Sequence, residues 1–214
     1  MTSMQNAPDT TVLNINPLVL TVDGFLSEAE CLGLIEAASD RLQRATVTDG
    51  AVGSVSQNRT NSHCPLSPQD TPIVLQLLMK LGMALRIPMN QAEGPIALHY
   101  AEAEEFRPHS DGIQMNADAE KLAGFERDGG QRLFSAMVYL NSVEAGGATS
   151  FPELGVTVQP APGRLLIFAN TLAGSRDVTN LSIHAGEPVT QGEKWSVITW
   201  WRERPRDAEN ATAL

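Results

Sequence analysis

The residues best suited to chemistry in this sequence are its four histidines, at positions 63, 99, 109 and 184. One residue separates His109 from Asp111, and on a β-strand the side chains at positions i and i+2 point to the same face. Both could therefore reach one ion, with Ser110 pointing away. A His-x-Asp pair alone is a weak indication, because a polar pair at the end of a surface strand has the same spacing.

A third ligand must come from elsewhere, and His184 lies in a late segment that we expect to be a strand. Two imidazoles and one carboxylate on one side of a metal leave coordination positions open, which is the ligand set of non-haem iron(II) oxygenases. A cupin-like isomerase or hydrolase could use the same residues to bind Zn or Mn. His63 and His99 have no ligand spacing and are expected to be structural or surface residues.

Lys194 begins an apolar segment, 194–201, ten residues after His184. In a strand, its side chain shares a face with those at 196, 198 and 200, while positions 195, 197, 199 and 201 face the other way. A lysine in the interior of a β core costs free energy unless an anion lies beside it. A dicarboxylic cosubstrate would supply that anion, whereas an exposed lysine on an edge strand would need none.

These residues belong to a longer pattern, over roughly residues 20–203, that resembles the catalytic domain of prolyl 4-hydroxylase alpha-subunit-type dioxygenases. The pattern comprises Tyr100, His109-x-Asp111, Gly129-Gly130-Gln131-Arg132, Tyr139-Leu140-Asn141, Gly146-Gly147-x-Thr149-x-Phe151-Pro152, His184-Ala185-Gly186, Gly192-x-Lys194-Trp195 and Trp200. The segments DGFLSEAECLGLIEAA and Arg59-Thr60-Asn61-Ser62 also resemble the N-terminal part of that family.

The resemblance implies an iron(II)- and 2-oxoglutarate-dependent hydroxylase that consumes O2, releases succinate and CO2, and is commonly supported by ascorbate. Its iron ligands would be His109, Asp111 and His184. The cosubstrate residues would be Lys194, on the distal carboxylate of 2-oxoglutarate, with Tyr100 and Thr149 hydrogen-bonding it and Trp200 lining the pocket. A cupin-like enzyme would leave Lys194 and Tyr100 without an evident role, and a catalytically silent jelly-roll binding module would be favoured by the loss of a ligand, which is not seen.

The resemblance further implies a polypeptide substrate, with hydroxylation of a proline and with Arg132 in contact with the peptide. Arg132 has a simpler interpretation, in which it caps a strand end or pairs with a nearby acid such as Glu126 or Asp128. A related hydroxylase of another residue or of a small molecule would use the same iron site. The chain looks like a compact microbial form and lacks the peptide-binding repeats of some eukaryotic relatives, so collagen is not implied as its substrate.

The elements that must position these residues follow from the periodicity of the sequence. Ser27 and Glu30 form a capping box that begins a helix, with Cys31, Leu34, Ile35, Ala38 and Leu42 on its apolar face. A second helix begins at Thr71-Pro72, and Pro88 ends it. Short β-rich segments follow at 96–100, 107–111, 132–140, 148–151, 156–158, 164–168, 181–185 and 194–201, after an early strand at 18–22.

This order predicts a mainly β protein with flanking α-helices, namely a double-stranded β-helix, or jelly roll, with two N-terminal supporting helices. The segment 133–140 is apolar on both faces and should be a central strand covered on both sides. We expect one domain over 1–214, with N-terminal support at 12–90, a catalytic core at 95–203 and a flexible tail at 204–214; the first eleven residues should be frayed. The segments 47–63 and 112–131 could act as lids, although a solvated insertion would look the same.

The formal net charge of −10 disfavours nucleic acid as a partner, because such a surface repels phosphates. The sequence contains no apolar run long enough for a membrane span and no signal peptide at its start, so a cytoplasmic protein is expected. Cys31 and Cys64 are expected to be reduced. The sequence does not indicate the oligomeric state.

Overall fold

The protein is described by a computed structural model over residues 9–45, 47–48, 53–54, 57–69, 71–114 and 119–206. An eight-stranded sheet runs through the molecule in the order β1-β2-β13-β9-β16-β7-β6-β3, and all of its neighbouring strands are antiparallel. Its strands are β1 (Asp9–Ile15), β2 (Leu18–Asp23), β3 (Gln43–Arg44), β6 (Ser62–Pro65), β7 (Ile96–Tyr100), β9 (Arg132–Tyr139), β13 (Leu165–Ala169) and β16 (Lys194–Arg202).

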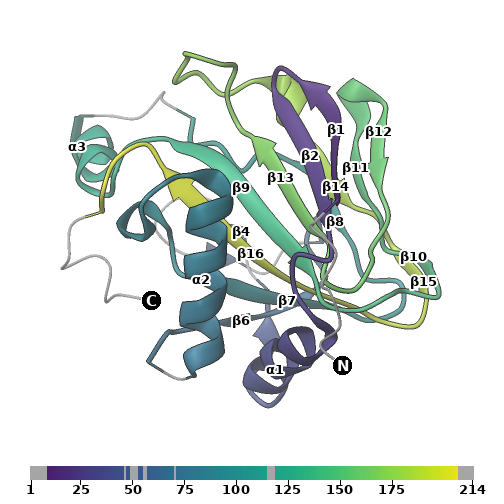
Figure 1. Ribbon diagram of the computed structural model, residues 1–214. Helices are drawn as coiled ribbons and strands as arrows, with labels where there is room; N and C mark the ends of the chain where they lie inside the picture. The colour runs from purple at the N-terminus through teal and green to yellow at the C-terminus, as the bar shows by residue number, and fades with distance from the viewer. Residues whose placement is uncertain are drawn as a thin grey trace.

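A smaller sheet, in the order β12-β11-β14-β8, covers one face of the large sheet (Figure 1). Its strands are β8 (Phe106–His109), β11 (Thr149–Phe151), β12 (Val156–Val158) and β14 (His184–Gly186). Two further strand pairs lie outside both sheets, β4 (Val47–Thr48) with β5 (Gly53–Ser54) and β10 (Ala145–Gly146) with β15 (Val189–Gln191). The antiparallel sheets are those of the double-stranded β-helix, so the predicted fold class is confirmed.

The central strand of the large sheet is β9, as the sequence predicted, with β13 on one side and β16 on the other. Its alternating side chains enter two different hydrophobic cores. Ala136 and Val138 pack on the helical side, and Met137 and Tyr139 pack on the side of the small sheet. Strand β16 alternates in the same way, so Lys194 and Trp200 face the space between the two sheets.

The two predicted helices cover the opposite face of the large sheet (Figure 1). Helix α1 (Glu28–Ser39) has the predicted capping box, in which Ser27 accepts from the Glu30 backbone and the Glu30 side chain accepts from the Ser27 backbone. Helix α2 (Pro72–Leu85) begins with Pro at its first turn and ends at Arg86, which adopts a left-handed conformation with φ of 56°. The helices therefore lie where they support the sheet from behind, away from the small sheet.

Several details differ from the sequence prediction. The first eleven residues were expected to be frayed, and residues 1–8 of them lie outside the described residues. Residues 9–11 are not frayed, because they belong to strand β1 and pair with β2. Helix α1 ends at Ser39, and Leu42 reaches the same core only after the chain has turned. At the end of the expected lid 47–63, Ser62 and His63 belong to β6 of the large sheet.

The segment 112–131 contains a third helix, α3 (Ala119–Arg127). Beyond 203, Arg204 and Arg206 form ion pairs with Glu126 and Asp128 at the end of α3. Residues 207–214 of the expected tail lie outside the described residues, as do 49–52, 55–56 and 115–118 of the two expected lids. None of the described helices is long and apolar enough to cross a membrane.

Candidate active site

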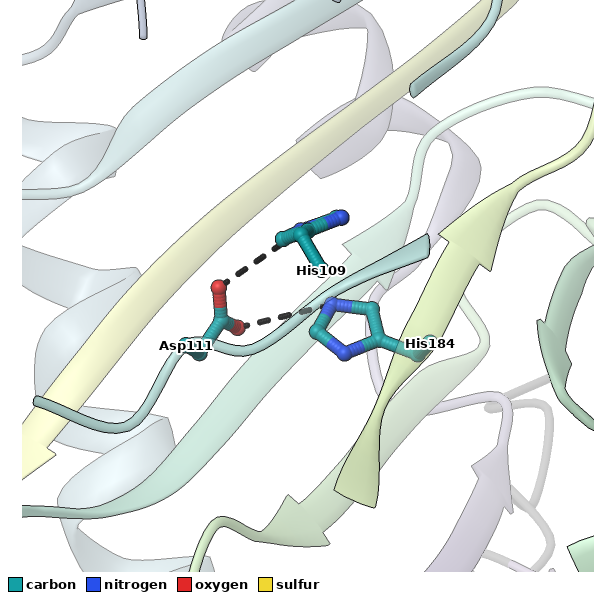
Figure 2. Close-up of side chains that lie close together, drawn as sticks. All are labelled: His109, Asp111 and His184. Atoms are coloured by element: carbon teal, nitrogen blue, oxygen red, sulfur yellow. Dashed lines mark ion pairs between the residues drawn. The ribbon is translucent and has the colours of Figure 1, made fainter. Parts of the chain in front are cut away.

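The three predicted metal ligands meet at one end of the small sheet. His109 is the last residue of β8, His184 is the first of β14, and the two are direct partners in the antiparallel register. Asp111 follows two residues after β8 and completes the group (Figure 2). One potential ligand atom from each residue lies within 4.8 Å of the others. The pairing of two strands that are distant in the sequence thus creates the site. Only the His109-x-Asp111 part of it is recognisable from residue spacing.

Both imidazoles are oriented by backbone carbonyl groups. The Nδ1 atom of His109 lies 2.8 Å from the carbonyl oxygen of Arg107, and the Nδ1 atom of His184 lies 3.1 Å from that of Ser182. A carbonyl oxygen can only accept, so both Nδ1 atoms carry hydrogen, and Nε2 is the atom that each neutral ring can offer as a ligand. Those Nε2 atoms lie 3.7 and 3.6 Å from the two carboxylate oxygens of Asp111. This arrangement of a ligand atom and a backbone partner is typical of metal-binding histidines.

The charge states suit a cation as well. Burial, together with the nearby His184, lowers the pKa of His109, so its ring is neutral at physiological pH. Burial by itself would raise the pKa of Asp111, but the two histidines and a hydrogen bond from Ser135 lower it below its ordinary value. The Ser135 hydroxyl donates to Asp111 Oδ2 at 2.7 Å and accepts from the Asn170 amide at 3.1 Å. Neutral imidazoles and an ionised carboxylate are the forms that bind a metal.

Aromatic rings fix the imidazoles from outside. Phe106 stacks on His109 with ring centroids 3.5 Å apart, and Phe168 packs against His184 at 4.5 Å. The guanidinium group of Arg59 lies 4.8 Å above the Phe106 ring. The sequence analysis missed the roles of Phe106, Ser135 and Asn170, because these residues have no common spacing relative to the ligands. Arg59 belongs to the RTNS segment, which was the one signal available for it.

A single cavity between the two sheets contains every residue predicted to bind metal or cosubstrate. Its lining includes His109, Asp111, His184, Tyr100, Thr149, Lys194 and Trp200. Lys194 lies at one end, only 2% exposed, and its Nζ donates to the Gly147 carbonyl at 2.8 Å. In the described part of the chain, no carboxylate forms an ion pair with Lys194. Burial lowers the pKa of Lys194 to about 7. The cavity therefore joins a metal-ligand group to a buried amine that lacks a counter-ion.

This combination agrees with what comparison with known proteins finds. The family model described as the 2OG-Fe(II) oxygenase superfamily matches residues 96–202. The chain belongs to the 2OG-Fe(II) oxygenase superfamily. It is 31% identical over 210 residues to probable prolyl 4-hydroxylase 7 of Arabidopsis thaliana, a match that covers 89% of this chain and 64% of that protein. The chain thus spans a little less than two thirds of that relative's length.

Solved structures give the same result. The viral collagen prolyl hydroxylase of Paramecium bursaria Chlorella virus 1, determined as a complex with 2-oxoglutarate, is 26% identical, with a TM-score of 0.66 and coverage of 85% of this chain and 93% of that one. A Pseudomonas putida prolyl-4-hydroxylase, 21% identical with a TM-score of 0.61, shares the fold, with coverage of 87% and 92%. Within the superfamily, this oxygenase is therefore of the prolyl 4-hydroxylase type, in a compact form.

The residues of this oxygenase fit the two groups that its superfamily requires. The triad offers two nitrogen lone pairs and one carboxylate, a donor set suited to Fe(II). The opposite end of the cavity offers the hydrogens of Lys194. Beside the triad, the indole Nε1 of Trp200 lies close enough to Asp111 to lower the pKa of that carboxyl, but it reaches no acceptor among the described residues at hydrogen-bond geometry. A buried donor without an acceptor usually marks a place where a ligand or water belongs.

Arg132 lies beside this cavity, outside its lining. Its guanidinium group stacks 4.0 Å above the Trp200 ring and donates to the Asp111 carbonyl at 3.4 Å. It also makes a bidentate ion pair with Glu93, at 2.5 and 2.7 Å. The sequence analysis had suggested Glu126 or Asp128 as an acidic partner. Those acids are instead paired with other arginines, Glu126 with Arg176 and Asp128 with Arg202.

The other two histidines and the cysteines lie away from the oxygenase site, as expected. His99 points to the opposite side of β7 from Tyr100, where it contacts the Trp195 ring and the Glu193 carboxylate. His63 is on the neighbouring strand β6, outside the metal-ligand group. Cys31 and Cys64 are buried and not disulfide-bonded.

Proposed function

We propose that this chain is an Fe(II)- and 2-oxoglutarate-dependent hydroxylase that hydroxylates a proline within a polypeptide and releases succinate and CO2. The observation that carries the proposal is the single cavity that holds the His109, Asp111 and His184 ligand group at one point and the buried amine of Lys194 at another. A metal hydrolase requires the metal ligands but not a buried amine. An enzyme that binds a dicarboxylic 2-oxo acid requires both, because the metal binds the 2-oxo acid end and the amine binds the distal carboxylate.

The protein's own contribution begins with the metal ligands. His109 and His184 would bind iron through Nε2, because their Nδ1 atoms are engaged by backbone carbonyls. Asp111 would bind through its carboxylate, which Ser135 holds in place. When bound, Fe(II) with 2-oxoglutarate and O2 supplies the oxidising power, converting 2-oxoglutarate to succinate and CO2 and inserting one oxygen atom into a C–H bond of the substrate.

The distal carboxylate of 2-oxoglutarate would bind at Lys194. The amine is surrounded by the rings of Tyr100 and Tyr139, at 4.7 and 5.8 Å, which exclude water from this end of the cavity. An ion pair formed in such surroundings is screened less than one at the surface. Tyr100 and Thr149 line the same space and would add hydrogen bonds to that carboxylate.

The proline substrate is supported by the relatives and by the neighbourhood of the metal ligands. Both the Arabidopsis protein and the viral protein carry prolyl hydroxylase names. Arg132 and Trp200 form a stacked pair directly beside Asp111. An arginine has several donors in a rigid fork, so Arg132 can keep Glu93 and still offer hydrogen bonds to a peptide carbonyl, and an indole ring gives a proline ring an apolar surface.

The test is to offer the Fe(II)-loaded enzyme short proline-rich peptides, the same peptides with alanine for proline, and free L-proline. Hydroxyproline and succinate are measured together. We expect hydroxyproline in the proline-rich peptides, matched by succinate, and only slow succinate formation with the alanine peptides. If free amino acids alone are hydroxylated, or if hydroxyproline appears in none of the peptides, the substrate assignment is wrong while the iron and 2-oxoglutarate sites stand.

A further inference from the structure

A hydrogen bond between two buried hydroxyl groups joins the two sheets at the Lys194 end of the cavity. The Tyr139 hydroxyl, on β9, donates to the Thr149 Oγ1 atom, on β11, at 2.7 Å. The two residues are 0% and 2% exposed. Tyr139 is not itself part of the cavity lining, whereas Thr149 is. The Tyr139 hydroxyl therefore meets the cavity through Thr149.

The direction of this hydrogen bond determines where the hydrogen of Thr149 can point. A phenol is a stronger acid than an alcohol and is the natural donor of the pair, and burial raises the pKa of Tyr139, so that it keeps its proton. The Thr149 oxygen uses a lone pair to accept from Tyr139, and its own hydrogen must point elsewhere. Among the residues that the structure describes, none accepts that hydrogen from Thr149. The hydrogen is left for the cavity.

This end of the cavity consequently presents donors. Lys194 has three hydrogens and uses one on the Gly147 carbonyl. The Thr149 hydroxyl adds one, and the Tyr100 hydroxyl lies in the same lining. A carboxylate has only acceptor positions and matches such a set, whereas a carboxamide brings two N–H groups that would face other donors.

We propose that Tyr139 is a positioning residue that holds the Thr149 hydroxyl as a donor toward the cosubstrate, so that this end of the cavity selects a carboxylate over a carboxamide. The inference rests on the proposed placement of the distal carboxylate of 2-oxoglutarate at Lys194. It assigns the Tyr139 hydroxyl a role in selectivity that acts entirely through Thr149. Without the phenol, the Thr149 hydroxyl is free to turn and to accept a hydrogen from an amide.

The experiment measures binding in place of turnover. The probes are N-oxalylglycine, in which an N–H replaces one methylene of 2-oxoglutarate, and its terminal amide, N-oxalylglycinamide. Each is titrated calorimetrically, without O2, into the Fe(II)-loaded protein. We expect the wild type to prefer the carboxylate about a hundredfold, since a charged hydrogen-bonded pair is lost with the amide. Tyr139→Phe should bind the carboxylate about threefold more weakly, bind the amide more tightly, and show a preference about tenfold smaller.

The decisive comparison is a double-mutant cycle. Thr149→Val should weaken N-oxalylglycine binding by about tenfold, and adding Tyr139→Phe to it should change neither affinity by more than about twofold. Tyr100→Phe is the matched control, because it removes a phenol from the same lining that has no hydrogen bond to Thr149. Its effect should add to that of Thr149→Val. Thr149→Ser keeps the hydroxyl and should retain the preference of the wild type.

The outcomes separate this inference from the proposed function. If Tyr139→Phe and Thr149→Val act additively, or if Tyr139→Phe leaves the preference unchanged, the role of Tyr139 is wrong. If Tyr139→Phe does not fold, the two Thr149 variants provide the test. The inference is then overturned if Thr149→Val and Thr149→Ser prefer N-oxalylglycine over its amide to the same extent. If the wild type binds no N-oxalylglycine, or if Lys194→Met binds it normally, the placement of 2-oxoglutarate fails and the inference fails with it.

Discussion

Replacing Lys194 with methionine should make the protein more stable at neutral pH while removing its affinity for 2-oxoglutarate. Methionine has nearly the length of lysine and no charge, so it can fill the same space between the Tyr100 and Tyr139 rings. The amine forms no ion pair with the described residues, and burial lowers its pKa to about 7 from an ordinary value of 10.5, although the more distant Glu187 carboxylate acts in the opposite direction. That difference corresponds to about 5 kcal/mol of unfavourable free energy for the charged form in the folded protein.

The dependence on pH follows from this direction of shift. Below about pH 7 the folded lysine is protonated, and the full penalty is present. As the pH rises from about 7 toward 10.5, the folded lysine has lost its proton while the unfolded one still binds it, so the penalty declines. From pH 7 to pH 9 the wild type should gain about 2 kcal/mol relative to Lys194→Met. The variant lacks the hydrogen bond to Gly147 at every pH, so this loss does not contribute to the change in the stability difference between pH 7 and pH 9.

The assay is urea unfolding of both proteins without 2-oxoglutarate at pH 7, 8 and 9. The difference between their free energies of unfolding should narrow by about 2 kcal/mol over this range, or by roughly 4–8 °C in Tm. Lys80→Met, at a lysine whose side chain is 35% exposed, is the control, and its difference from the wild type should not change with pH. If the free energies of unfolding of the wild type and Lys194→Met depend on pH in the same way, the reasoning is refuted. That result would mean that burial does not lower the pKa of the Lys194 amine.

Other predictions concern proton uptake, the metal and the Arg132 neighbourhood. Binding of 2-oxoglutarate at pH 8 should take up about 0.9 proton, since most of the free Lys194 is then neutral and must be charged in the complex; calorimetry in buffers of different ionisation enthalpy measures this, and uptake near zero would contradict it. His184→Ala should lower the Fe(II) content of the purified protein by more than tenfold, measured by metal analysis, whereas His99→Ala should leave it unchanged. Glu93→Gln should lower the free energy of unfolding by about 3 kcal/mol, because Arg132 and Arg202 both lose a buried anion. Urea unfolding measures this, and the control Asp23→Asn, which breaks the more exposed pair with Arg164, should cost less than about 1 kcal/mol. Equal losses in the two variants would show that the Glu93 ion pairs stabilise the fold no more than a surface pair does.

The sequence predicted the catalytic strands well because their information is local. Alternation in 194–201 was enough to place Lys194 and Trp200 on one face. The His-x-Asp spacing also identified His109 and Asp111 as partners, but the expected strand 107–111 ends at His109, so Asp111 reaches the site from the loop after β8 and not from the same strand face. The pairing of His184 with His109 joins residues 75 positions apart in the chain, so only the resemblance to a family could suggest it. Strand β1 was missed because its residues are polar at first and become a strand by pairing with β2.

The supporting contacts were harder to foresee for the same reason. Nearby acids were the natural partners for Arg132 in the sequence, yet Glu93, 39 residues away, is the one that it contacts. The strand order brings Glu93 beside the ends of β9 and β16, where its backbone accepts from Thr199. Likewise, Ser135 supports Asp111 only because the fold brings the residues after β8 beside β9. Such contacts depend on how the strands are arranged, and no residue spacing encodes them.

The central claim is that one cavity holds both Fe(II) and 2-oxoglutarate, and the most direct test is O2-dependent conversion of 2-oxoglutarate to succinate by the purified protein. We expect succinate to form when Fe(II) is added, to be absent after chelation, and to be abolished in Asp111→Ala and in Lys194→Met at low 2-oxoglutarate concentration, while Lys80→Met behaves as the wild type. Succinate formation that is independent of Fe(II), or that persists unchanged in Asp111→Ala, would contradict the claim.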